Sequence, residues 1–207
     1  MIQSIQASKV SFATLREVFG LTRNKSPQFF TEWLALDSAV NESEIQAIDR
    51  IVSNFEYLME EPPLLEEGVK MVVLAPLLDL AAFYQPPFRF KPELSVEIQA
   101  IGTDGTVVRG SIDVLVLCDT VWLCVIEAKM TTFALNVALP QILSYMLASP
   151  TNPCFGMLTN GNEFLFVKLS QEGNPQFATS KVFSLYAPGN ELIEVFKILC
   201  HLGRSTL

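Results

Sequence analysis

Two apolar stretches that each contain an acidic residue constrain the fold of this chain more than any other part. Residues 112–118 and 122–128 are almost wholly apolar, yet the first contains Asp113 and the second contains Glu127. Runs of this length and composition are typical of strands that are covered on both faces of a sheet. A buried carboxylate costs free energy of desolvation unless a partner compensates its charge. The sequence therefore predicts two central strands with a compensating cation beside them, most simply a divalent metal ion.

The turn between these strands decides whether their acidic residues share a face. Alternate residues of a strand point to the same side, so Glu127 and Lys129 project together. A two-residue turn would place Asp113 opposite Ile126, with its side chain on the other face. We therefore predict either a three-residue loop over residues 119–121 or a β-bulge, because both bring Asp113 opposite Glu127.

The polar side chains at this point suit a hard divalent cation. Mg²⁺ prefers one or two protein carboxylates, keeps several waters, and takes further oxygens from a substrate phosphate. Asp113 and Glu127 are the predicted metal ligands, and the carbonyl of Ala128 is a possible third. Such an ion polarises a phosphoryl oxygen and generates hydroxide, while Lys129 would stabilise the attacking water or the charge on phosphorus. The pattern indicates phosphodiester hydrolysis with Mg²⁺ or Mn²⁺.

The same residues resemble a known family signature. Asp113 followed by Glu127-Ala128-Lys129 is similar to the D…(D/E)-x-K signature of the PD-(D/E)XK nuclease superfamily. The segment Gln141-Ile142-Leu143-Ser144-Tyr145 resembles the Q-x-x-x-Y element of the type I restriction enzyme R-subunit nuclease domain and of RecB-like nucleases. Two further segments resemble the T-N-G turn and the first-helix P-L-L of the R-subunit group, namely Thr159-Asn160-Gly161 and Ala75-Pro76-Leu77-Leu78. The resemblance covers roughly residues 64–202.

This resemblance implies a fold, an activity and further site residues. It implies a restriction-endonuclease-like α/β fold, with a mixed central sheet flanked by helices, and a Mg²⁺-dependent nuclease that acts on DNA. Gln141 and Tyr145, which lie four apart on one helix face, would position the backbone or a base of the substrate. A glutamate of the first core helix sometimes joins the metal site in such folds; Glu66 and Glu67 are both candidates, with Glu67 favoured.

The sequence also departs from the family pattern. Ile112 stands where the superfamily has a proline before the aspartate, and Ser111 stands where the R-subunit group often has an arginine. No segment resembles the helicase motor of that family, so we expect helicase or specificity proteins as partners, and a homodimer as a further possibility. The alternative hypothesis is a catalytically inactive binding or assembly module that acts within a larger complex. The pattern leaves open DNA or RNA, and single or double strands.

Segments of helical and strand periodicity predict two regions. Residues 1–62 are expected to form an N-terminal helical extension, and residues 63–207 the domain that carries the site. Residues 41–44 read Asn-Glu-Ser-Glu, a capping pattern that predicts the start of a helix, and Pro76 should kink or divide a buried helix over residues 66–83. Further helices are predicted over residues 12–19, 26–36, 134–148 and 191–202, and strands over residues 94–100, 154–159, 163–168 and 181–186, with a turn at Asp104-Gly105.

Composition narrows the class of protein. The net charge of −8 opposes broad attraction to nucleic acid, although a carboxylate-rich metal site is itself negative until it is loaded. Four cysteines without C-x-x-C spacing are expected to be reduced, and a single histidine, His201, disfavours a Ser-His-Asp or Cys-His site. No apolar stretch is long enough to span a bilayer, so we expect a cytoplasmic protein that does not associate with membranes.

Overall fold

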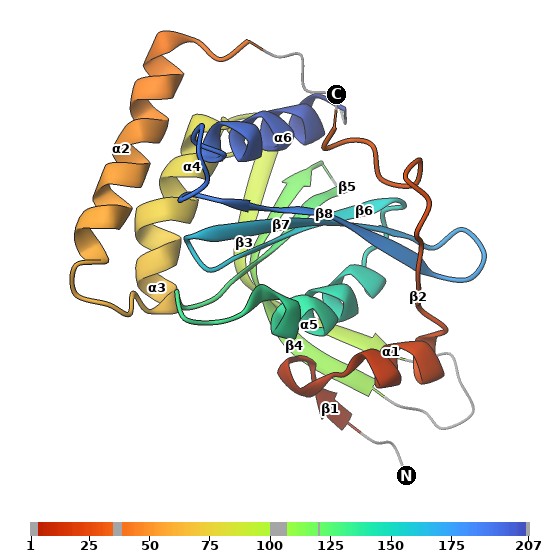
Figure 1. Ribbon diagram of the computed structural model, residues 1–207. Helices are drawn as coiled ribbons and strands as arrows, with labels where there is room; N and C mark the ends of the chain where they lie inside the picture. The colour runs from red at the N-terminus through yellow and green to blue at the C-terminus, as the bar shows by residue number, and fades with distance from the viewer. Residues whose placement is uncertain (1–3, 35–38, 100–106, 120, 206–207) are drawn as a thin grey trace.

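A mixed sheet with helices on both faces forms the centre of the computed structural model, which describes residues 4–34, 39–99, 107–119 and 121–205 (Figure 1). The expected α/β class with a mixed central sheet is confirmed. In the described residues the strands are β1 (Ser4–Gln6), β2 (Thr22–Arg23), β3 (Phe88–Gln99), β4 (Val107–Cys118), β5 (Val121–Ala128), β6 (Cys154–Thr159), β7 (Glu163–Ser170) and β8 (Gln176–Ser184).

The sheet consists of two antiparallel units that are joined by the parallel pair of β5 and β6, and the short strands β1 and β2 pair in parallel with β4 and β8. Its strand order is β1-β4-β5-β6-β7-β8-β2, with β3 paired to β4. Strands β3, β4 and β5 pair antiparallel, as do β6, β7 and β8, while β5 and β6 pair in parallel. The parallel pair requires a crossover, and the helix between these two strands provides it. The carboxyl end of β5, which carries the predicted site, therefore lies inside the sheet.

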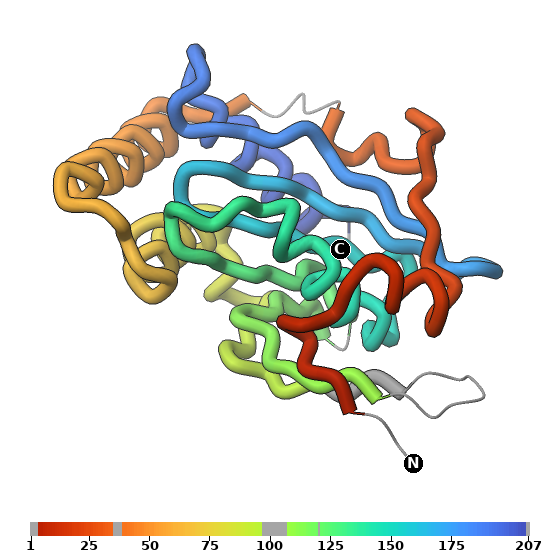
Figure 2. Tube along the Cα trace, turned by 60° about the horizontal axis from the view of Figure 1, so that its bottom comes forward, coloured from red at the N-terminus to blue at the C-terminus, as the bar shows by residue number. Residues whose placement is uncertain are grey.

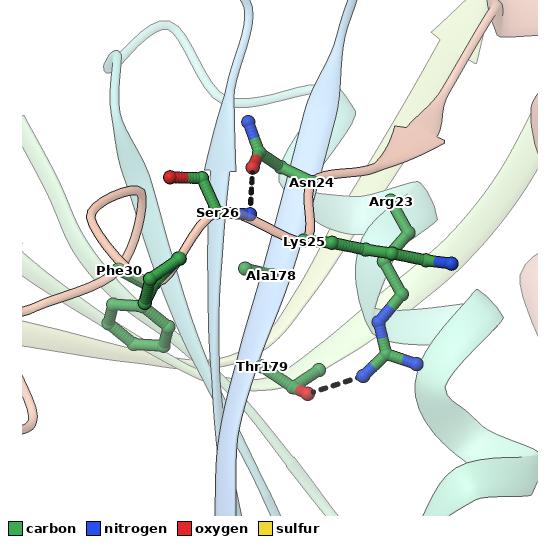
Figure 3. A pocket seen from close by; sticks show the side chains of 8 residues that line it. Arg23, Asn24, Lys25, Ser26, Phe30, Ala178 and Thr179 are labelled. Carbon is green, nitrogen blue, oxygen red and sulfur yellow. Dashed lines mark hydrogen bonds between the residues drawn. The ribbon is translucent and has the colours of Figure 1, made fainter.

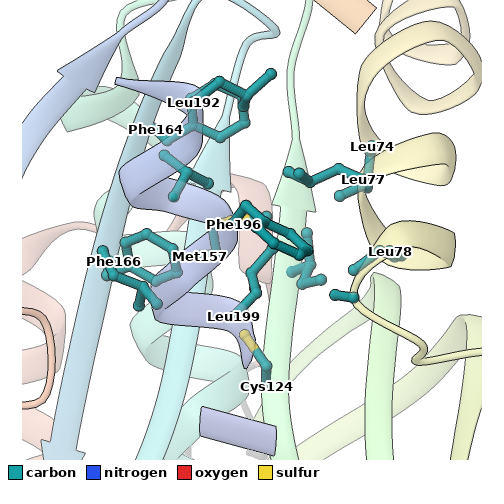
Figure 4. Packing of buried hydrophobic residues seen from close by; sticks show 14 of the residues in the cluster. Leu74, Leu77, Leu78, Cys124, Met157, Phe164, Phe166, Leu192, Phe196 and Leu199 are labelled. Atoms are coloured by element: carbon teal, nitrogen blue, oxygen red, sulfur yellow. The ribbon is translucent and has the colours of Figure 1, made fainter. Parts of the chain in front are cut away.

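Helices cover both faces of this sheet. They are η1 (Ala7–Lys9), α1 (Phe12–Phe19), α2 (Glu42–Leu58), α3 (Glu66–Val69), η2 (Lys70–Leu74), α4 (Ala75–Leu80), α5 (Leu135–Leu147) and α6 (Leu192–Arg204). One apolar core joins α2, α4 and α6 to one face, and a second joins α1 and α5 to the other. Figure 4 shows the first core, where Phe196 and Leu199 of α6 lie over Met157 of β6 and beside Leu77 of α4. The helix start predicted from residues 41–44 is confirmed. Asn41 and Glu44 form a capping box at the first turn of α2, in which each side chain accepts from the other's backbone N–H.

The helix predicted over residues 66–83 is divided into α3, η2 and α4. Pro76 has no backbone N–H and its ring crowds the preceding turn, which disfavours regular α-helical geometry there. The π-helical turn η2 ends at Leu74, just before Ala75 and Pro76 in the first turn of α4, and accommodates the irregularity. The prediction that this helix is buried is confirmed for one side only: Leu74 and Leu77 are buried, whereas Met71 is largely exposed.

The N-terminal segment is joined to both ends of the sheet. Strand β1 pairs with β4, and β2 pairs with β8, so the first sixty residues contain strands as well as helices. The helix predicted over residues 26–36 is absent from its described part, where the chain forms turns. The division at residue 62 stays a prediction. Three strands begin several residues earlier than predicted, β3 at Phe88, β4 at Val107 and β8 at Gln176. The predicted Asp104-Gly105 turn lies outside the described residues.

Within the part of the chain that the structure describes, no helix has the length and apolar character needed to cross a membrane.

Candidate functional site

The turn between β4 and β5 is two residues long, because Cys118 pairs with Val121 across it. This turn length would by itself place Asp113 and Glu127 on opposite faces of the sheet. The predicted three-residue loop over residues 119–121 is therefore wrong.

A β-bulge restores the register on which the site depends. The ladder shifts by one residue just after Val116, and beyond the shift Val114 pairs with Ile126. The next position along the ladder sets Asp113 opposite Glu127, so their side chains leave the sheet on one face. The bulge, which was the other predicted solution, is confirmed; bulges of this kind commonly aim side chains at functional sites.

Both carboxylate oxygens of Asp113 have partners. Its Oδ2 accepts a hydrogen bond of 2.7 Å from the backbone N–H of Ala128, and its Oδ1 lies 3.5 Å from the ammonium of Lys70. Burial raises the pKa of Asp113, while the hydrogen bond from Ala128 and the charge of Lys70 oppose that rise. Asp113 is thus fixed in orientation by the neighbouring strand and by a helix.

Glu127 is almost fully buried, with 1% of its surface exposed. Its Oε1 accepts hydrogen bonds from the ammonium of Lys129 and from the side-chain amide of Gln141. Its Oε2 is buried without any partner among the described residues. Burial and the adjacent Asp113 raise the pKa of Glu127 to about 8, although Lys129 acts in the opposite direction. A buried carboxylate oxygen without a partner is a rare arrangement that a bound cation would satisfy.

Helix α5 supports Glu127 through two residues. Gln141 donates to Glu127 and also, over 2.9 Å, to the hydroxyl of Tyr145. Tyr145 is buried against β4, where its ring would meet a Cβ atom built on Gly110 at 2.7 Å. Burial and the charge of Glu127 raise the pKa of Tyr145 above its usual value. This placement favours a role for Tyr145 in fixing Gln141 and Glu127 over direct contact with a substrate.

Lys129 follows the last residue of β5 and is anchored to β6. Its backbone N–H donates to the carbonyl of Thr159 over 2.8 Å. The turn after β6 is tight, since Gly161 has a φ of +87° and its Cα faces the ring of Phe55. The Oδ1 of Asn160 closes this turn by accepting from the backbone N–H groups of Asn162 and Glu163, and its side-chain amide donates to the carbonyl of Phe133 over 3.0 Å. The T-N-G segment therefore holds the end of β5 in place.

Lys70 is a site residue that sequence reasoning missed. Its ammonium lies 2.9 Å from Glu67, 3.2 Å from Glu66, 3.4 Å from Glu93 and 3.5 Å from Asp113. Burial alone would lower the pKa of Lys70, but the carboxylates around it raise the pKa above its usual value. Its spacing of three and four from two glutamates was visible in the sequence, whereas its reach to Asp113 depends on the fold.

Glu93 is a second residue that was missed. It has a φ of +51°, an uncommon conformation for a residue other than glycine, and it interrupts β3 directly opposite Asp113. Its carboxylate accepts from the hydroxyl of Ser111 at 3.5 Å. The preceding Pro92 was the only signal, because a proline within a strand indicates an edge or an irregularity.

The two candidate glutamates of the first core helix differ in placement. The side chain of Glu67 is 77% exposed, whereas that of Glu66 is 38% exposed. The charge of Glu66 contributes to the raised pKa of both Asp113 and Glu127. This geometry favours Glu66, although the sequence favoured Glu67, and either assignment stays a prediction.

Two hollows open beside these side chains. One of about 440 Å³ is lined by Glu66, Lys129, Phe133 and Gln141, among others. The other, of about 320 Å³, reaches Asp113 from the side of β3 and α4. Among the described residues, no three His, Cys, Asp or Glu side chains lie close enough together to hold a metal ion by themselves. Any ion here would therefore take its remaining ligands from water, backbone or substrate, as Mg²⁺ commonly does.

A further hollow, of about 420 Å³, lies between β8 and the segment after β2 (Figure 3). It contains none of the predicted site residues. Its polar groups bond to one another, since Arg23 donates to Thr179 over 3.0 Å and Ser26 donates to Asn24 over 2.8 Å. These bonds anchor the segment to the sheet.

Comparisons with known proteins give a single kind of match. No family model and no curated protein matches the chain. Solved structures similar to it include a fragment of a putative HsdR subunit of a type I restriction enzyme from Vibrio vulnificus. The TM-score is 0.43 at 17% sequence identity, and the match covers 67% of this chain and 26% of the other. The chain spans about a quarter of that structure.

Proposed function

We propose that this protein is a nuclease that hydrolyses DNA phosphodiester bonds with Mg²⁺ or Mn²⁺. The observation that carries the proposal is the pairing of Asp113 and Glu127 on one face, with Glu127 Oε2 buried and without a partner. Burial of two carboxylates, one of them with an oxygen that has no partner, costs free energy of desolvation. A divalent cation bound between them would offset that cost.

Each residue has a defined part in this proposal. Asp113 and Glu127 would hold the ion, with the carbonyl of Ala128 as a third donor. When bound, the ion would polarise a phosphoryl oxygen and lower the pKa of a coordinated water. Lys129, whose ammonium bonds to Glu127, would stabilise the negative charge that develops on the attacking water and phosphate. Gln141 holds Glu127 in position from the side of α5.

A cleavage assay tests this proposal with two site variants and one control. Single-stranded and duplex DNA are incubated with Mg²⁺ or Mn²⁺ and wild type, Asp113→Asn, Lys129→Met or Lys181→Met. Lys181 also pairs with a glutamate, Glu191, but lies on β8. Loss of roughly 100-fold or more is expected for the two site variants and no loss for the control. Equal activity of all four proteins would contradict the proposal.

The second candidate is an assembly module with this fold and no turnover. The net charge of −8 favours it, as does the satisfaction of Lys70 and Lys129 by acidic side chains within the protein. Calorimetry with Mn²⁺ separates the two candidates. Micromolar binding that Glu127→Gln abolishes supports the nuclease, and absence of binding at millimolar Mn²⁺ supports the module.

A further inference from the structure

An apolar pocket lies directly beside Asp113. It has a volume of about 320 Å³, and its apolar walls come from Met71, Leu78, Tyr84, Phe90, Pro92 and Val114. The ring centroids of Tyr84 and Phe90 lie 4.9 Å apart, with an angle of 55° between the ring planes. Tyr84 is 39% exposed and Phe90 is 46% exposed. Exposed aromatic surface of this kind next to a polar site commonly marks a place where a ligand binds.

We propose that this pocket binds an unpaired nucleobase of the strand whose phosphate lies at Asp113. The inference builds on the proposed nuclease function and names its substrate class, which is single-stranded DNA or a frayed or flapped duplex end. Base stacking on Tyr84 and Phe90 would hold the nucleotide next to the scissile phosphate.

The position of the pocket favours a nucleobase over other apolar groups. Asp113 lines the pocket and also belongs to the proposed metal site, so one nucleotide can span both. A base and its phosphate are joined through a single sugar and must therefore bind close together. Lys70 is the cation among the lining residues, and its ammonium lies 3.5 Å from the Asp113 carboxylate. Aromatic stacking beside a cation is the usual arrangement for binding single strands.

The two rings in the lining favour an unpaired base. Residues of α3, η2 and α4 line the pocket together with residues of β3 and β4, and Tyr84 and Phe90 offer their rings to a ligand inside it. A base inside a duplex is stacked on both faces and paired along one edge, and it must be extruded before it can enter such a site. Substrates whose bases are already free should therefore bind more tightly than blunt duplexes.

Fluorescence of an oligonucleotide that contains 2-aminopurine tests the proposal independently of cleavage. Wild type, Phe90→Ala, Phe90→Leu and Tyr84→Ala are titrated with Ca²⁺ present against single-stranded and blunt duplex forms. The control is Tyr186→Ala, which removes an exposed ring outside the pocket. We expect quenching with wild type and the control, and roughly 5- to 100-fold weaker binding with the Phe90 and Tyr84 variants. Phe90→Leu keeps the apolar contact and loses the stacking, so it guards against a general folding defect.

The outcomes separate this inference from the proposed function. Asp113→Asn should lose cleavage and keep the quenching that depends on Phe90. Cleavage by wild type together with unchanged affinity of the Phe90 and Tyr84 variants would overturn the base site and leave the nuclease standing. Quenching that depends on Phe90 without any cleavage would support the base site and contradict the nuclease. Binding of no oligonucleotide by any variant would overturn the base site, and the pocket would then suit an apolar side chain of a protein partner.

Discussion

At the scale of single residues, the site is defined by how its charges are shared. Asp113 has a partner on each oxygen, whereas Glu127 has both partners on one oxygen and none on the other. Lys70 neutralises the acidic groups on the side of Asp113, and Lys129 does so on the side of Glu127. The asymmetry at Glu127 is what makes the pair a candidate for binding a cation.

Replacement of Lys70 by methionine tests the electrostatic role of its ammonium, because methionine keeps an apolar side chain at this position and removes the charge. Lys70→Met removes the partner of the buried Asp113 Oδ1, so we expect a loss of about 1–2 kcal/mol in unfolding free energy without metal. Millimolar Mn²⁺ should raise the melting temperature of this variant more than that of wild type. Thermal melts with EDTA and with Mn²⁺ measure both effects. Lys181→Met, whose lysine is 48% exposed in its ion pair, serves as the control and should change little.

Replacement of Tyr145 tests its role as a positioning residue. Tyr145→Phe keeps the packed ring and removes the hydroxyl that accepts from Gln141. We expect roughly tenfold weaker Mn²⁺ binding and a comparable loss in kcat, with little change in KM for DNA. Calorimetry and steady-state kinetics measure these values. A rise in KM with unchanged kcat would instead indicate direct contact between Tyr145 and the substrate.

At the scale of elements, the hairpin of β4 and β5 shows what the sequence can and cannot predict. Alternation within β5 placed Glu127 and Lys129 on one face, because facing follows from the period of a strand. Asp113 joins that face only with the right register between the two strands. The sequence could not distinguish a three-residue loop from a bulge, because both place Asp113 opposite Glu127. The bounds of α1 and β6 match the predicted ones, as these segments have clear apolar periodicity and end signals.

Lys70 and Glu93 were missed for a related reason. Lys70 pairs with Asp113 from 43 positions away in the sequence, out of a π-helical turn, and Glu93 faces Asp113 from 20 positions away, at an irregularity of β3. Such local departures from regular geometry follow from tertiary packing and leave little trace in the sequence. The segment over residues 26–34 was mistaken for a helix because its apolar residues pack on the sheet from turns.

The packing of α5 on β4 can be tested at Gly110. A Cβ atom there would lie 2.7 Å from both the ring of Tyr145 and the side chain of Ala7. Gly110→Ala should therefore lower the unfolding free energy by about 1–3 kcal/mol, and it should weaken Mn²⁺ binding because Tyr145 shifts. Urea denaturation gives the first value. Gly203→Ala is the comparison, because its nearest neighbour is 3.1 Å away and the helix gains propensity there.

At the scale of the whole molecule, the N-terminal segment crosses from the β4 end of the sheet to its β8 end (Figure 2). Its apolar residues join the core beneath α5. We expect a chain that begins at residue 63 to lose cooperative unfolding, measured by near-ultraviolet circular dichroism in urea. Cooperative unfolding of that truncated chain at the wild-type midpoint would show that residues 1–62 are a separate extension.

The acidic balance of the molecule gives a second expectation at this scale. With a net charge of −8, the protein should bind DNA weakly through general electrostatics, so its affinity should depend on the loaded metal site and on few phosphate contacts. The slope of log affinity against log salt concentration should therefore be shallow. Sedimentation velocity under the same conditions would establish whether a homodimer binds.

Anomalous X-ray diffraction from crystals soaked in Mn²⁺ tests the central claim most directly. The account predicts one peak between Asp113 and Glu127 Oε2, at bonding distance from both carboxylates, and no peak there in Glu127→Gln crystals. A wild-type crystal with Mn²⁺ bound only at the exposed acids Glu67 and Glu93, or nowhere near Glu127, would contradict it.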